Sequence, residues 1–160
     1  MDLFSRIVQR EDNPTAPTRK PLRKNSIDHW PLVVLLERAA YLRKLAALGD
    51  GTASETLKEY PQHSTMLCVR SRSGDVELHD NFACMFHVLD GRATLLTGSI
   101  VAGAEPIASG DILAASIEPG GRQELRAGDV VHIPTGQRHQ ILVAGEKTVT
   151  YLAMKIQETP

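Results

Sequence analysis

A twelve-residue run from Gly128 to His139, GDVVHIPTGQRH, constrains the fold more than any other part of the chain. It sets two glycines, a proline and a histidine at fixed offsets, in the pattern G-x5-P-x-G-x2-H. A glycine before a β-rich segment can take the positive φ of a tight turn, and Pro134 followed by Gly136 marks another turn. The segment HQILV then begins a returning strand. The run therefore predicts two short strands joined by a turn, with His139 directed into the space that the strands enclose.

The chain after Gly49 favours an all-β fold. Apolar residues there recur with period two, and Gly or Asp stands at most joints. Several short strands at such spacing are typical of a sandwich or barrel. The segment 98–121, rich in Gly, Ala and Ser, is long for a turn and is expected to form a lid or a hairpin at the barrel mouth. The predicted strands are Met66–Arg70, Val76–His79, Met85–Leu89, Arg92–Thr97, Asp129–Ile133, Gln140–Val143 and Thr148–Lys155.

The N-terminal part divides into two segments. Residues 1–30 are polar, with three prolines and a basic cluster, and predict a flexible arm. Residues 31–49 predict a helix, with Pro31 in the first turn and Gly49 just past the end. We expect the helix to pack on the barrel domain, residues 50–160; the alternative is that it covers an edge strand or a dimer interface. Its apolar residues at helical spacing are Leu32, Leu35, Leu36, Ala39, Leu42, Leu45 and Ala46.

The Gly128–His139 run resembles the second conserved motif of the cupin superfamily, whose members are small β-barrels that often hold a metal. The segment VELHDNFACMFHVLDG resembles a degenerate form of the first motif, G-x5-H-x-H-x3,4-E-x6-G. Aligning Gly91 with its closing glycine, which turns the hairpin, puts Cys84 at the glutamate position. The same alignment puts His79 and Glu77 at the two histidine positions. The resemblance covers roughly Thr65 to Lys155 and implies one cupin 2 type barrel, a double-stranded β-helix related to the jelly roll.

This resemblance implies a metal site with Glu77, His79, Cys84 and His139 as candidate ligands. A divalent ion, iron or zinc, would suit two imidazoles and a thiolate. In a strand, Glu77 and His79 share one face, while His87 points away from Cys84 and is a poor candidate. The alternatives are a polar pocket without metal and a Cys84 that is a buried hydrophobe or a nucleophile with His79 as its base.

Two functions fit these residues. The first is a metal-dependent enzyme acting on a small organic molecule, such as an oxygenase, isomerase or lyase. The second is a non-catalytic module that binds or senses a small ligand with a degenerate metal site. The changed residues at positions 77 and 84 leave both open, and the sequence assigns no catalytic residue and no organic cofactor.

The composition of the chain limits which partners and which cellular location can be expected. The 160 residues suit one domain, and a net charge of -1 gives no reason to expect nucleic-acid binding. The apolar run Leu32–Leu36 is too short to span a membrane and comes too late for a secretory signal. Only two cysteines, Cys68 and Cys84, are present, which fits a reducing compartment, and we expect a cytoplasmic protein. Because cupins commonly pair through sheet edges, we also expect a homodimer.

Overall fold

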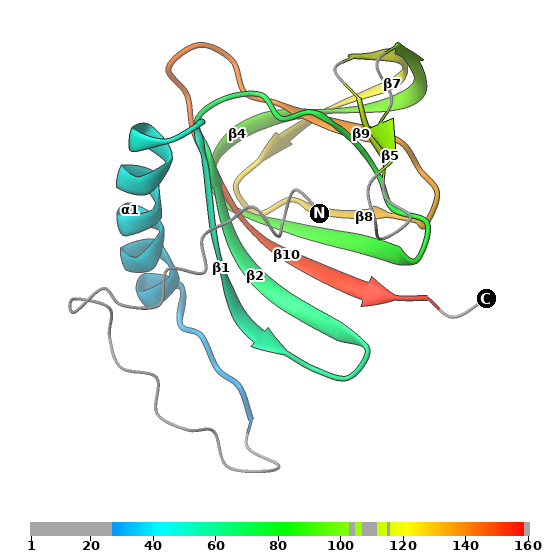
Figure 1. Cartoon of the computed structure of the whole chain (residues 1–160). Helices are drawn as coiled ribbons and strands as arrows, with labels where there is room; N and C mark the ends of the chain where they lie inside the picture. The colour runs from blue at the N-terminus through cyan, green and yellow to red at the C-terminus, as the bar shows by residue number, and fades with distance from the viewer. Residues whose placement is uncertain (1–26, 103–104, 107–111, 115, 159–160) are drawn as a thin grey trace.

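One long strand, β4 (Phe82–Ala102), joins the two halves of an antiparallel β-barrel (Figure 1). The structure is a computed structural model that describes residues 27–102, 105–106, 112–114 and 116–158, so most of the predicted arm lies outside the described residues. The other elements are α1 (Leu32–Leu48), β1 (Thr52–Glu59), β2 (His63–Arg70), β3 (Val76–Leu78), β5 (Glu105–Pro106), β6 (Ile112–Ala114), β7 (Ser116–Arg126), β8 (Val130–Ile133), β9 (His139–Leu142) and β10 (Val149–Gln157).

Strand order explains how β4 links the halves. The sheet runs β1-β2-β10-β4-β9-β3-β6-β5, and β7 and β8 also pair with β4. The first part of β4 pairs with β10 and β8, and the later part pairs with β7 and β9. This arrangement confirms the predicted all-β barrel, and it brings β3 and β9, which are distant in sequence, side by side.

The predicted strands Met85–Leu89 and Arg92–Thr97 are in fact one strand. Gly91, expected to turn a hairpin, instead has a φ of +82° inside β4. It pairs with Val149, and the register with β10 shifts between Thr150 and Tyr151. A glycine with positive φ accommodates such a bulge without ending the strand. Gly128 and Gly136 have φ of +95° and +77°, which confirms the two turns predicted around the Gly128–His139 run.

The segment expected to be a lid or a hairpin forms a hairpin in its described part. The pairing of β4 with β7 extends from Arg92 opposite Arg126 to Ala102 opposite Ser116. The sequence analysis missed β7, and it also missed β1, whose sequence TASETLKE lacks an apolar alternation. In β1 only Ala53 and Leu57 are buried, because one face of this edge strand lies under the helix.

The predicted helix is confirmed as α1, and it packs against β1 and β2 as expected (Figure 1). Two details were wrong. Leu32, assigned to the buried stripe, is 54% exposed, and Gly49 has a φ of -109°, so it does not adopt the left-handed cap. An ion pair between Arg38 and Glu55 adds a polar contact to the helix–strand interface. The buried residues of this layer are Leu35, Ala39, Leu42, Ala46, Ala53, Leu57, Leu67 and Val69.

No helix among the described residues is both long enough and apolar enough to cross a membrane.

The faces of β2 and β4 that point away from α1 line the barrel interior. Cys84, Phe86 and Val88 share one buried cluster, as the alternation of β4 predicts. His87 is outside that cluster and only partly buried, and its backbone pairs with Leu152 and Val130.

Candidate metal centre

Two neighbouring strands of the barrel bring three candidate ligands together. Glu77 lies on β3 directly opposite His139, the first residue of β9. His79 follows β3, two residues after Glu77, and its carbonyl accepts a hydrogen bond of 2.8 Å from the Gly136 amide. That bond ties the turn of the Gly128–His139 run to the end of β3. The two sequence motifs therefore meet at one place in the fold.

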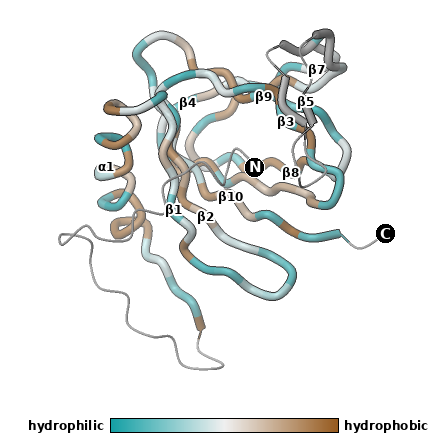
Figure 2. Tube along the Cα trace, viewed as in Figure 1, coloured by the Kyte–Doolittle hydropathy of each residue, from teal (hydrophilic) through white to brown (hydrophobic). Residues whose placement is uncertain are grey.

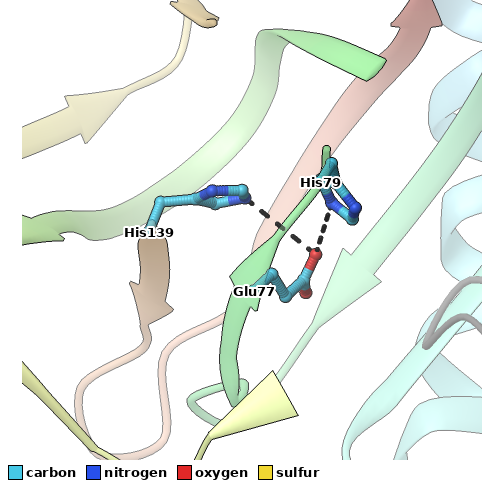
Figure 3. Close-up of side chains that lie close together, drawn as sticks. All are labelled: Glu77, His79 and His139. Atoms are coloured by element: carbon cyan, nitrogen blue, oxygen red, sulfur yellow. Dashed lines mark ion pairs between the residues drawn. The ribbon is translucent and has the colours of Figure 1, made fainter. Parts of the chain in front are cut away.

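The three side chains point toward one another (Figure 3). Oε2 of Glu77 is 3.3 Å from Nε2 of His79 and 4.0 Å from Nε2 of His139. One ligand atom from each residue lies within 4.8 Å of the others, and all three residues are buried. Two ligands of one ion at about 2.1 Å each lie at most about 4.2 Å apart. The carboxylate is therefore close enough to each imidazole to share an ion with it.

The tautomer of His139 leaves one ring nitrogen available as a ligand. Its Nδ1 is 3.0 Å from the carbonyl oxygen of Gln137. Because a carbonyl can only accept, Nδ1 carries the proton and Nε2 of the neutral ring carries a lone pair. That Nε2 is buried and has no hydrogen-bond partner among the described residues. A backbone carbonyl that fixes one nitrogen while the other is free is the usual arrangement of a metal-bound histidine.

A buried arginine holds the other side of the carboxylate. Nη2 of Arg70 donates to Oε1 of Glu77 over 3.0 Å, and Nε donates to the Tyr151 hydroxyl over 3.0 Å. Arg70 is 3% exposed. Because Arg70 occupies Oε1, Oε2 remains directed at the histidines. The sequence analysis missed Arg70 and Tyr151 as members of the site.

Charges in this network are strongly coupled. Burial alone would raise the pKa of the Glu77 carboxyl, but the hydrogen bond from His79 and the charge of Arg70 lower it to about 2. Burial would likewise lower the pKa of His79, yet hydrogen bonds to Cys84 and Glu77 raise it to about 10. Burial lowers the pKa of His139. Without metal, the cluster holds an anionic Glu77 between a protonated His79 and Arg70.

Cys84, the fourth candidate, lies next to this group but not within it. It contributes to the raised pKa of His79, so the two side chains interact. It is not among the ligand atoms that converge within 4.8 Å. Its buried neighbours include Met66, Cys68 and Phe86. Both cysteines are free thiols.

The donor set suits a divalent transition metal. Two imidazoles and one carboxylate are the ligands of non-haem iron(II) sites, which keep further positions open, and zinc binds the same atoms. The unpartnered Nε2 of His139 facing a carboxylate fits such an ion, because otherwise a lone pair and a negative oxygen face each other in a buried site. Binding would require His79 to lose its proton.

Comparison with solved structures establishes the class of fold. The chain superimposes on a Cupin 2 conserved barrel domain protein from Salinispora arenicola with a TM-score of 0.50 and 21% identity, over 83% of this chain and 91% of that chain. KdgF from a Halomonas species gives a TM-score of 0.50 at 12% identity, over 69% and 84% of the two chains. The polyketide cyclase RemF from Streptomyces resistomycificus gives 0.49 at 17% identity, over 69% and 68%.

The chain is therefore a cupin by fold, and its described residues form a single cupin barrel. No family model and no curated protein sequence matches it. At these identities the likeness concerns the fold alone. What the barrel does must be argued from its own residues.

Proposed function

We propose that the barrel binds one divalent metal ion, iron or zinc, through Glu77, His79 and His139, and uses it to bind a small organic molecule. The observation that carries this proposal is the buried, unpartnered Nε2 of His139 directed at Oε2 of Glu77 beside His79. Cys84 is an additional candidate donor, since it contributes to the raised pKa of His79. It would join the ion only if its side chain moved toward the group.

A bound ion would supply Lewis-acid chemistry, polarising an oxygen of the bound molecule. The residues of the chain would orient that ion and exclude water. Arg70 fixes the carboxylate through Oε1, and the Gln137 carbonyl fixes the ring of His139. These supports favour a metal-dependent enzyme acting on a small organic molecule, of the oxygenase, isomerase or lyase type, because they pre-arrange the ligands before binding.

One observation favours a second function. Arg70 already balances the charge of Glu77, and Cys84 and Glu77 both favour the protonated form of His79. The charges of the network are therefore largely balanced without an ion. Under this alternative, the barrel is a non-catalytic module that binds or senses a small ligand in a polar, metal-free pocket.

Metal analysis of protein purified without chelators separates the two functions. We expect about one equivalent of iron or zinc per chain, lost in His139→Ala and in Glu77→Gln. His132→Ala is the matched control, because His132 lies in the same sequence run but is exposed. Wild-type protein that takes up no stoichiometric metal, even after incubation with iron(II) or zinc, would leave the metal-free ligand module as the better account.

Two further expectations accompany the proposal. Cys68 and Cys84 are buried, unpaired thiols, which supports a reducing compartment, and we propose a cytoplasmic location. We also propose that the protein acts as a homodimer. Neither expectation depends on the metal.

A further inference from the structure

The outer face of α1 carries exposed apolar side chains, although it does not pack on the barrel. The inner face buries Leu35, Ala39, Leu42 and Ala46 against β1 and β2. A surface helix normally turns polar residues to solvent on its other side. Here apolar residues recur along the whole helix (Figure 2). Those exposed on the outer face include Val33 at 62%, Val34 at 39%, Tyr41 at 45% and Leu48 at 87%.

The exposed apolar residues of this face fall in two columns. Val34, Tyr41 and Leu48 are spaced by seven, and Val33, Ala40 and Ala47 form a second column with the same spacing. Residues seven apart lie on one side of a helix, and the two columns are about 100° apart around its axis, because successive residues differ by that angle. We call these six residues the α1 outer stripe.

Two charges lie between the two columns and are placed symmetrically along the helix. On a helical projection, Glu37 and Lys44 form a third column at the centre of the outer face, on either side of the midpoint at Ala40 and Tyr41. In a parallel pair of identical helices, each charge would face its own kind. In an antiparallel pair about a two-fold axis at residues 40 and 41, Glu37 faces Lys44 of the second copy, and Val33 faces Leu48 of the second copy. The stripe is thus self-complementary in charge in only the antiparallel arrangement.

We propose that the α1 outer stripe is a homodimer interface in which α1 packs antiparallel to α1 of a second copy. A helix of 17 residues offers a seam of roughly 25 Å. The interface is therefore small, and the dimer should dissociate on dilution. Because α1 lies on the outside of β1 and β2, the metal cluster inside each barrel stays separate from the contact.

The first test is the oligomeric state of the full chain, measured by sedimentation equilibrium over a range of concentrations. We expect a reversible monomer–dimer equilibrium that Val33→Glu weakens by about tenfold or more, because it buries a charge in the seam. Val33 is in the first helical turn, where an acidic side chain favours the helix, so the variant should remain folded. Circular dichroism and thermal unfolding check this.

Charge reversal tests the antiparallel register. Glu37→Lys and Lys44→Glu should each weaken the dimer, and the double variant should restore it, because the two charges exchange places across the two-fold axis. Lys147→Glu, in an exposed loop before β10, is the control and should have no effect. A monomer at every concentration would overturn the proposal, and would instead fit a stripe covered by another partner or by residues 1–26. A dimer insensitive to Val33→Glu, or not restored by the double variant, would overturn it equally.

Discussion

At the scale of single residues, Arg70 decides how the carboxylate of Glu77 is presented. It is buried, it bonds Oε1, and its other contact is the hydroxyl of Tyr151. Removing one member of a buried ion pair leaves the other charged and unsatisfied, whereas replacing both with apolar residues is often neutral. The pair therefore positions a candidate metal ligand, and losing one member of the pair would destabilise the fold.

The cost of breaking this pair can be measured. We expect Arg70→Met to reduce the free energy of unfolding by about 3–5 kcal/mol in chelator-treated protein. The double variant Arg70→Met/Glu77→Leu should recover most of that loss, since no charge is then left buried. Urea unfolding gives both values. A single variant as stable as the wild type would mean that Arg70 and Glu77 are not paired.

The pKa of His79 predicts how stability changes with pH. Its folded pKa is about 10, above the ordinary value of 6.5, so the stabilisation is complete below about pH 6.5 and is lost as pH rises toward 10. In metal-free protein, the free energy of unfolding should fall between about pH 6.5 and pH 9. His79→Gln should flatten that fall. An identical pH profile in the variant would refute the assigned protonation of His79.

In contrast to folding, metal binding should be opposed by the proton on His79. Because an imidazole ligand must be neutral, uptake of zinc by the wild type should release about one proton and weaken as pH falls. Titration in two buffers of different ionisation enthalpy measures the proton count. Zinc uptake that is independent of pH would contradict a site that includes His79.

At the scale of elements, the bulge in β4 depends on Gly91. A Cβ at this position would lie 2.0 Å from the backbone oxygen of Thr148, and φ is +82°. Gly91→Ala should therefore cost about 2 kcal/mol or more, combining strain and displacement of backbone. Gly145→Ala is the control: its φ is +57° but nothing lies within 4 Å, so it should cost only about 1 kcal/mol. Equal costs in thermal or urea unfolding would mean that the close approach to Thr148 is absent.

The helix α1 stabilises the barrel through its inner face. Leu42 is 4% exposed and packs in the layer between α1 and β2, so Leu42→Ala should cost about 2–5 kcal/mol. Leu32→Ala, at a 54% exposed position, should cost less than about 0.5 kcal/mol. Urea unfolding of the two variants checks the difference. Similar losses would show that α1 presents another face to the sheet.

The sequence predicted elements best where local signals were strong. The spacing of Gly128, Pro134 and Gly136 predicted the turns before His139, and the helix pattern predicted α1. It failed where tertiary context decides. The strand β1 has no apolar alternation because Glu55, on the same face as Ala53 and Leu57, pairs with Arg38 of α1. Gly91 continues a strand because β10 pairs with it. These effects depend on neighbours distant in sequence.

At the scale of the whole molecule, the barrel assembles a site from residues that no local pattern connects. Glu77 and His139 are 62 positions apart by their numbers and become cross-strand partners. Their candidacy came from a family resemblance, and the fold places them together with His79. Arg70 could not be recognised in this way, because it ends a strand in which both faces are apolar. Its partners, Glu77 and Tyr151, come from β3 and β10, which are distant from it in sequence.

Anomalous diffraction from crystals grown without chelators is the most direct test of the metal centre. Data collected on both sides of the iron or zinc absorption edge should show one strong peak per chain inside the barrel. We predict that it lies about 2.0–2.2 Å from Nε2 of His79, Nε2 of His139 and an oxygen of Glu77. Continuous density for the three side chains with no anomalous peak, in crystals soaked in both metals, would contradict the metal centre.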